Sequence, residues 1–358
     1  MERIRGLLES GVREKIFPGA VLLAAVEGEI RFLHACGVAN LFTGRKMTVS
    51  TIFDLASLTK ALATAPAMMK LLDAGLLDMG ESLETYLPEF AGTDKAAVKI
   101  FHLLLHTAGF PAHRPYYLGL EKMAPGRRKA ALREMLAAEP LEYFPGEKTL
   151  YSDLGFMILE WLVERTGGKP LDRFVEQEIY GPLGLQNLFF QNPFQPRAGC
   201  FAATELCPWR GKLMEGEVHD ENAWAAGGVS GHAGLFGTAE DVFRVLLHLW
   251  KCWAGLCSNR FFSKNTVRYF LSPLRNSERC LGFDRPSGSE PSCGKFFSSN
   301  TVGHLGFTGT SLWMDLDRSV IVILLSNRVH LGRENIRIRA FRPRIHDAVM
   351  EALETDTF

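Results

Sequence analysis

Strand patterns lie at both ends of this chain, helical patterns lie between them, and this arrangement constrains the fold more than any other feature. Residues 20–26 and 29–36 are apolar runs separated by a short turn, which predicts a pair of strands. Residues 308–316 and 319–325 form a second such pair. We therefore expect an antiparallel sheet built from both ends of the chain, with a helical region inserted between its halves.

Helical patterns fill the rest of the sequence. We expect helices over residues 2–15, 57–74, 98–106, 127–138, 153–166, 171–179, 239–253 and 334–353, with the last one kinked or divided at Pro343. The arginines of the last segment are interpreted as a solvated face, with a surface for acidic partners as the alternative; they are Arg337, Arg339, Arg342 and Arg344. The expected fold class is α/β of the α+β kind, with N- and C-terminal helices flanking the sheet.

Composition argues against several classes of protein. The 358 residues carry 40 Lys+Arg and 40 Asp+Glu, so no basic excess indicates a nucleic-acid partner. No apolar run approaches the ~18 residues of a membrane-spanning helix, and no signal-peptide pattern opens the sequence. Seven cysteines without a C-x-x-C pair favour reduced thiols over disulfides or a zinc site. We therefore expect a cytoplasmic protein, while removal of a signal peptide would leave a periplasmic location open.

The segment Ser57-Leu58-Thr59-Lys60 can supply a nucleophile. Residues three apart on a helix share a face, so the Lys60 ammonium can reach the Ser57 hydroxyl. A serine hydroxyl needs such a neighbouring base or cation before it attacks a carbonyl carbon. The same spacing recurs at Ser292 and Lys295, but only the first copy runs directly into a helical segment.

Two further segments carry polar groups that suit the same chemistry. Tyr151 stands two residues before Asp153, at the start of a predicted helix, where Asp153 could equally be a simple helix cap. A phenol beside a lysine ammonium has a lowered pKa, which makes Tyr151 a candidate general base. His304 and Gly306 precede the C-terminal strand pair, and a glycine there allows a substrate to lie against an edge strand.

Together these segments resemble the serine β-lactamase and penicillin-binding-protein superfamily, in its class C-like esterase and β-lactamase-related branch. That branch combines Ser-x-x-Lys, Tyr-x-Asn and, in esterases, often His-x-Gly, and these correspond here to Ser57–Lys60, Tyr151–Asp153 and His304–Gly306. Flanking segments such as 103–109 and 234–241 also look like that branch, so the resemblance covers nearly the whole chain.

The resemblance implies a β-lactamase/transpeptidase-like fold of two domains. We expect residues 1–75 and 225–358 to form the sheet domain and residues 76–224 the mainly helical insertion, with the active site at their interface. It implies no metal and no organic cofactor. The expected partner is a small-molecule ester or lactam substrate, and the oligomeric state stays open.

The resemblance also implies a role for individual residues. Ser57 is the nucleophile that becomes acylated, Lys60 shuttles its proton, and Tyr151 is the base that later activates water. The backbone N–H groups of Ser57 and Phe307 form the oxyanion hole, and such donors contribute roughly 3 kcal/mol each where they have been measured. Asp153, together with His304 and Gly306 of the third motif, lies beside the bound substrate.

Two departures from the branch indicate the kind of substrate. Asp153 replaces the usual Asn and only accepts hydrogen bonds, so it cannot donate to an amide carbonyl and can instead pair with Lys60. His304-Leu305 replaces Lys-Thr, which weakens the anchoring of a substrate carboxylate because histidine is mostly neutral at pH 7. Both changes favour small or hydrophobic carboxylic esters over β-lactams, with weak β-lactamase activity still allowed.

Two other functions remain open. A β-lactamase or an amide-cleaving enzyme of the D-aminopeptidase or DD-carboxypeptidase type would use the same residues. A non-catalytic binding protein would have lost them, and the intact Ser57, Lys60 and Tyr151 argue against that alternative.

Several other polar and aromatic residues have an ordinary structural interpretation. His102 and His106 are taken as structural histidines, rather than as a metal pair on one helix. Residues 219–222 are taken as a hydrogen-bonded loop, rather than as an active-site rim or a metal site. Trp313 and Phe307 could shape an acyl pocket, although aromatic residues on strands more often lie in the core.

Overall fold

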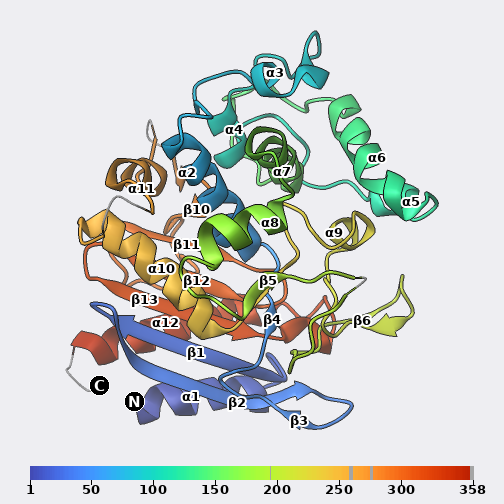
Figure 1. Ribbon diagram of the computed structural model, residues 1–358. Helices are drawn as coiled ribbons and strands as arrows, with labels where there is room; N and C mark the ends of the chain where they lie inside the picture. Colours follow the sequence, from blue (N-terminus) through green and yellow to red (C-terminus); the bar gives the residue numbers. More distant parts are fainter. Residues whose placement is uncertain (194, 258–260, 275–276, 355–358) are drawn as a thin grey trace.

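Two strands from opposite ends of the chain pair at the centre of the fold. The structure, a computed structural model (Figure 1), describes residues 1–193, 195–257, 261–274 and 277–354. β1 (Gly19–Val26) lies antiparallel to β13 (Val320–Ser326). Over these described ranges the main sheet has eight strands in the order β3-β2-β1-β13-β12-β11-β10-β9, and all neighbours are antiparallel. The expected sheet built from both chain ends is therefore confirmed.

The other strands of this sheet extend it on both sides of the central pair. They are β2 (Glu29–Asn40), β3 (Arg45–Lys46), β9 (Arg279–Cys280), β10 (Phe283–Asp284), β11 (Thr301–Leu305) and β12 (Ser311–Asp315). β12 begins later than the strand predicted over 308–316, because residues 306–310 form a tight turn. In that turn the Gly306 N–H donates to the Thr310 carbonyl over 2.7 Å.

Alternate residues of the central strands face two different cores. Leu22 and Leu324 belong to a cluster with the flanking helices α1 (Glu2–Arg13) and α12 (Ile338–Glu354), whereas their neighbours Leu23 and Ile323 belong to the larger core on the other face. That second face is covered by α10 (Ala239–Ala254), as Figure 1 shows. Because both faces are buried, these strands are apolar throughout residues 20–26 and 320–325 instead of alternating with polar residues. The α+β fold class is confirmed.

The segment between the two halves of the sheet is mainly helical. Its helices are α3 (Leu83–Tyr86), η2 (Pro88–Phe90), α4 (Ile100–Leu104), α5 (Tyr117–Leu120), α6 (Pro125–Ala138), α7 (Asp153–Gly167), α8 (Leu171–Val175), η3 (Glu176–Tyr180) and α9 (Glu221–Ala225). The later helices α11 (Lys264–Leu271) and η4 (Arg328–Leu331) lie outside this segment.

Two small sheets accompany the helices. β5 (Leu188–Phe190) pairs with β8 (Leu235–Gly237), which also pairs with β4 (Phe53–Asp54), while β6 (Leu206–Cys207) pairs with β7 (Lys212–Leu213). β5 thus ties the helical segment to β8, which follows that segment in sequence and pairs on its other edge with β4. The division at residues 75/76 and 224/225 stays a prediction.

The helix predicted over 57–74 starts with an irregular turn. A π-helical turn, η1 (Lys60–Thr64), precedes α2 (Ala65–Asp73), and the Ala65 N–H reaches back to the Lys60 carbonyl. Pro66 has no N–H to give to the Leu62 carbonyl four residues earlier. The Tyr180 hydroxyl donates to that carbonyl instead, over 3.0 Å. The wide turn therefore follows from a proline and from a contact made by a distant residue.

Two helix predictions need correction. α4 ends at Leu104, and His106 has a positive φ of 58°, so His102 and His106 do not share a helix and the assumed i,i+4 pair does not exist. α12 runs as one helix with Pro343 in its second turn, so the proline does not divide it. None of the helices in the described part of the chain is both long and apolar enough to span a membrane.

The interpretation of the C-terminal arginines as a solvated face is wrong for Arg342. That side chain is 5% exposed, whereas Arg344 on the same helix is exposed. Arg342 follows Ile338 by four residues and precedes Ile345 by three, so it lies on the apolar face of α12.

The expectation of seven reduced cysteines is also wrong. Cys252 and Cys257 form a disulfide, while Cys36, Cys200, Cys207, Cys280 and Cys293 are free. The chain turns back after α10 through Gly255, in the left-handed conformation (φ 80°), which brings the two Cα atoms to 4.8 Å. Disulfides are rare in cytosolic proteins, so the cysteines no longer support a cytoplasmic location.

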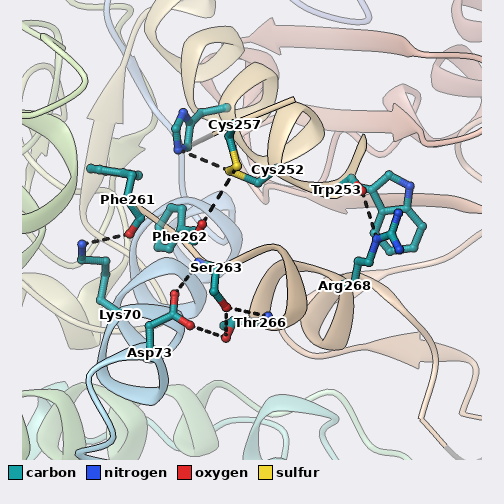
Figure 2. The surroundings of a disulfide bond; sticks show 11 residues. Lys70, Asp73, Cys252, Trp253, Cys257, Phe261, Phe262, Ser263, Thr266 and Arg268 are labelled. Carbon is teal, nitrogen blue, oxygen red and sulfur yellow. Dashed lines mark hydrogen bonds between the residues drawn. A yellow bond between two sulfur atoms is a disulfide. The ribbon is translucent and has the colours of Figure 1, made fainter. Parts of the chain in front are cut away.

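The disulfide lies beside the contact between this loop and α2. Figure 2 shows Lys70 and Asp73 of α2 facing the segment that follows Cys257. The Lys70 ammonium donates to the Phe261 carbonyl over 3.0 Å, and the Ser263 N–H donates to the Asp73 carboxylate over 2.7 Å. The disulfide therefore closes a short loop next to the helix that begins just after Ser57.

We expect thiol titration of the unfolded, unreduced protein to detect five thiols, and seven after reduction, because Cys252 and Cys257 are bonded to each other. The double variant C252S/C257S is the control and should give five thiols under both conditions. Seven thiols before reduction would contradict the disulfide.

Candidate active site

Ser57 stands in a turn between β4 and the helical segment that continues into η1 and α2. The buried Asp54 carboxylate accepts hydrogen bonds from the N–H groups of Ala56, at 2.8 Å, and His219, at 2.6 Å. Ala56 takes a positive φ of 48°, a conformation uncommon for alanine. The turn is thus fixed by side-chain hydrogen bonds, and it presents Ser57 at the start of the helix as the sequence predicted.

Lys60 lies fully buried beneath Ser57. Its ammonium donates to the Ser57 hydroxyl at 3.1 Å, to Asp153 at 2.8 Å and to the His232 carbonyl at 3.2 Å. The Lys60–Asp153 pair expected from the sequence is therefore present. Burial by itself lowers the pKa of Lys60, but the charge of Asp153 and the contact with Tyr151 outweigh it and raise the pKa above its ordinary value. Lys60 is a charged ammonium with all three of its protons engaged.

Tyr151 approaches the same ammonium from the start of α7. Lys60 Nζ lies 4.9 Å from the centre of the tyrosine ring, and the ring of His106 packs against it at 4.4 Å. Burial raises the pKa of Tyr151, and Asp153 adds to this effect, while Lys60 and Ser57 only partly oppose it. The expectation of a lowered pKa is therefore wrong, because desolvation of the phenolate exceeds the attraction of one ammonium that Asp153 already neutralises.

A cavity of about 740 Å³ opens above these groups. Its wall includes Ser57, Tyr151, His304, Gly306 and Phe307. Lys60 and Asp153 are not among the lining residues. Three segments distant in sequence thus meet around one cavity, with the hydroxyl and the phenol at its wall and the ion pair behind them.

The strand β11 carries a neutral His304, and part of one edge of this strand has no partner strand among the described residues. Burial lowers its pKa to about 4, and its Nδ1 lies 2.9 Å from the Leu305 carbonyl oxygen. β11 pairs fully with β12 but meets β10 only at Gly303 and Asp284. Residues 304–305 are therefore free of a strand partner on the β10 side, among the residues the structure describes.

Gly306 is required by packing rather than by room for a substrate. A Cβ atom there would overlap the Thr310 hydroxyl and approach the Leu55 carbonyl to 2.8 Å. The expectation that this glycine makes space for a ligand is thus corrected: the missing side chain lets the 306–310 turn pack against the turn that carries Ser57.

Phe307 belongs to the cavity wall and packs on a buried histidine, His219. Phe307 is 49% exposed and stacks on His219 with ring centroids 5.6 Å apart. His219 itself is not among the lining residues, and its ring nitrogen Nε2 lies 3.0 Å from the Glu205 carboxylate. Residues 219–222 thus form a hydrogen-bonded loop, as expected, in which the Asp220 carboxylate also accepts from the Ala223 N–H. Trp313 is 1% exposed and lies in the core, as strand aromatics usually do. No group of three or more His, Cys, Asp or Glu suited to a metal occurs in the described ranges.

Sequence reasoning missed four residues that contact this site. His106 accepts a hydrogen bond from the Ser152 N–H at 3.0 Å and packs on Tyr151, and the His232 carbonyl accepts from Lys60. Arg328 and Arg342 are buried and line the cavity. A signal existed for Arg342, whose spacing puts it on the apolar face of its helix. We find no comparable signal for the two histidines.

Comparison with known proteins gives consistent matches over most of the chain. A family model described as "Beta-lactamase" matches residues 4–343. The "Putative D-alanyl-D-alanine carboxypeptidase" of Escherichia coli (strain K12) is 35% identical over 351 residues, covering 88% of this chain and 79% of that protein.

Solved structures share the fold. "EstCE1, a hydrolase with promiscuous acyltransferase activity" superimposes with a TM-score of 0.73 at 22% identity, covering 96% of this chain and 98% of its own. A mutant of the simvastatin synthase of Aspergillus terreus gives 0.73 at 19% identity, with 99% of both chains covered. At these identities the likeness establishes the fold alone.

We expect Tyr151 to titrate above the ordinary range of tyrosine, and the substitution Asp153→Asn to move its titration to lower pH, because the carboxylate disfavours the phenolate. NMR of the protein labelled at tyrosine Cζ measures this, with Y151F to assign the signal. Asp172, also in the first turn of a helix but outside the cavity wall, supplies the control D172N, which should leave the titration unchanged. An unaltered titration in D153N would show that Asp153 does not set the charge state of the pair.

Proposed function

This chain belongs to the β-lactamase family, and on that premise we propose that it is a serine hydrolase that acts through an acyl-enzyme on Ser57. The observation that carries the proposal is the 3.1 Å contact between Lys60 Nζ and Ser57 Oγ, with Tyr151 at the wall of the same cavity. A nucleophile, a cation and a potential base within reach of one another are what acyl transfer through serine needs.

The charge states suggest how the proton moves. Tyr151 is protonated at rest because of its raised pKa, so it acts in those molecules whose phenol has released its proton to solvent. There the phenolate accepts the Ser57 proton, and the Lys60 ammonium stabilises the Ser57 oxygen as its negative charge develops. Ser57 Oγ bonds to the acyl carbon, and Tyr151 then gives the proton to the leaving alcohol as the ester C–O bond breaks. In deacylation Tyr151 takes a proton from water, whose oxygen attacks the acyl carbon, and returns that proton to Ser57 Oγ as the bond between Oγ and the acyl carbon breaks.

The oxyanion hole is assigned to two backbone groups. The N–H groups of Ser57 and Phe307 have no acceptor within the described residues, and both residues border the cavity. Free N–H groups beside a nucleophile are suited to bind the oxygen of a tetrahedral intermediate.

Small or hydrophobic carboxylic esters are the proposed substrates. Asp153 is engaged by Lys60 and cannot donate to an amide carbonyl, and the buried His304 carries no charge to attract a carboxylate. The cavity wall also includes the apolar side chains of Leu305, Ile336 and Ile338. These features favour an ester with an apolar group, and they allow β-lactam hydrolysis only as a weak activity.

A second candidate is an amide-cleaving enzyme of the DD-carboxypeptidase type, whose substrates end in a carboxylate. The observation in its favour is a group of three arginines in the cavity wall. Arg328, Arg339 and Arg342 line it and have no ion pair with a carboxylate in the described part of the chain. The name of the Escherichia coli relative agrees with this candidate.

We expect a fluorophosphonate probe to label the protein at Ser57 and not to label S57A.

The variant Y151F should keep its fold and lose ester turnover by about 100-fold or more, because general-base catalysis contributes at least that factor. The kcat/KM for p-nitrophenyl butyrate should exceed that for nitrocefin. Equal labelling of the parent and S57A would remove Ser57 from the mechanism, and a higher kcat/KM for nitrocefin would overturn the ester preference.

Two aryl esters that differ only in a carboxylate on the leaving phenol separate the two candidates. For an esterase we expect the uncharged ester to be cleaved faster. For a DD-carboxypeptidase-like enzyme the charged ester should be preferred, and R339A, which removes an exposed arginine of the cavity wall, should reduce that preference about ten-fold, as expected for a charged contact of ~1.4 kcal/mol. The control R344A removes an exposed arginine outside the cavity wall and should change neither rate.

A further inference from the structure

We infer that Arg342 is a positioning residue of the oxyanion hole: it fixes and polarises the Gly306–Phe307 peptide from behind, so that the Phe307 N–H is directed at the reacting carbonyl. The inference rests on the proposed function, because an oxyanion hole matters only if Ser57 attacks a carbonyl carbon. It assigns a task to a buried arginine that the sequence patterns did not connect with the motifs.

The geometry of a single peptide unit links Arg342 to the site. The Gly306 carbonyl and the Phe307 N–H belong to one planar trans peptide, in which the two groups point in opposite directions. The Arg342 guanidinium donates through Nη2 to the Gly306 carbonyl at 3.1 Å and to the Thr310 carbonyl at 2.8 Å. Holding that carbonyl oxygen on one side directs the N–H of the same unit to the other side, away from α12.

The next peptide unit is held in the same way. Arg328 Nε donates to the Phe307 carbonyl at 2.9 Å, and the Arg328 guanidinium lies 4.7 Å from the centre of the Phe307 ring. Arg328 is itself fixed through Nη1, which donates to the carbonyls of Arg333 and Asn335 at 3.0 and 2.8 Å. Both peptide planes that flank Phe307 therefore accept a hydrogen bond from a buried guanidinium.

The cost of burying Arg342 argues that its charge has a use. Arg342 is 5% exposed and has no carboxylate partner among the described residues. Burial, with Arg328 and Arg339 nearby, lowers its pKa to about 9. Burying a charge without a counter-charge is energetically unfavourable, and an apolar side chain would fill the same space at less cost.

A cation on the carbonyl side of a peptide also changes the opposite end of that peptide. Hydrogen bonds to a charged donor are about twice as strong as neutral ones, and hydrogen bonds in series polarise one another. Electron density drawn toward the Gly306 oxygen makes the Phe307 N–H a better donor. Arg342 is thus expected to act on the reacting carbonyl through Phe307.

A purely structural role for Arg342 would also hold the 306–310 turn, so the test must read the hydrogen bond to the acyl group. We propose infrared difference spectroscopy of the acyl-enzyme formed from an ester labelled with ¹³C at its carbonyl. The variant Arg342→Gln can still donate to the Gly306 carbonyl but carries no charge. We expect its acyl carbonyl band to lie at higher frequency than that of the parent, because a weaker N–H donor polarises the carbonyl less.

Kinetics and inhibitor binding supply two further readouts. Losing an oxyanion-hole donor outright costs about 100- to 1,000-fold in kcat, so we expect R342Q, which only weakens one, to lose about 10- to 100-fold with KM nearly unchanged. Affinity for phenylboronic acid, which forms a tetrahedral adduct with the serine, should fall by a similar factor. The control R344Q neutralises an exposed arginine two residues further along the same helix, and it should match the parent in all three measurements.

The outcomes separate this inference from the proposed function. If the parent forms no acyl-enzyme at Ser57, the proposed function fails, whatever R342Q does. If the parent is acylated and R342Q has the parental carbonyl frequency and boronate affinity, the role of Arg342 is wrong. Should R342Q fail to fold, R342K keeps the charge but cannot hold two carbonyl oxygens in one plane. A folded R342K should show a smaller shift in the same direction, and a parental frequency there overturns the inference as well.

Discussion

The buried ammonium of Lys60 holds the candidate site together. Its three protons go to the Ser57 hydroxyl, the Asp153 carboxylate and the His232 carbonyl, which come from three separate segments of the chain. A charge that is fully enclosed is tolerated only when each of its protons has an acceptor and a counter-charge lies close. The convergence of these segments is therefore enforced by the energetic cost of leaving Lys60 unsatisfied, and the cavity beside Ser57 follows from that convergence.

Burial also determines the protonation states of the titratable groups at the site. The charge of Asp153 raises the pKa of Lys60, and burial raises the pKa of Tyr151. Both groups are therefore protonated in the resting state. The neutral His304 adds no charge to the cavity. The positive charge of Lys60 thus lies beside the nucleophile at rest, whereas Tyr151 must lose its proton before it can act as a base. Asp153 disfavours that loss, so the activity depends on how strongly its carboxylate raises the pKa of Tyr151.

Sequence reasoning recovered what depends on local pattern. The apolar strands at both chain ends, the helix that follows Ser57 and the pairing of Asp153 with Lys60 could all be read from residue type and spacing. The sequence-based predictions were wrong or incomplete where a feature depends on contacts with residues far away in the sequence. The π-helical turn after Ser57 depends on Tyr180, the disulfide depends on a reversal of the chain at Gly255, and the pKa of Tyr151 depends on how much water the fold excludes. For Arg342, the spacing along the helix could have predicted that the side chain is buried, but not that it binds the Gly306 carbonyl.

The pairing of β1 with β13 has a consequence for how the chain acquires its shape. Partners such as Val21 and Leu325 are about 300 residues apart in sequence, so the central ladder raises the contact order of the whole protein. During synthesis on a ribosome β1 emerges long before β13, and until then β1 has one unpaired edge and lacks the helix α10 that covers one of its apolar faces. The N-terminal hairpin must therefore be shielded from aggregation by early contacts or by a chaperone until the last quarter of the polypeptide has been made.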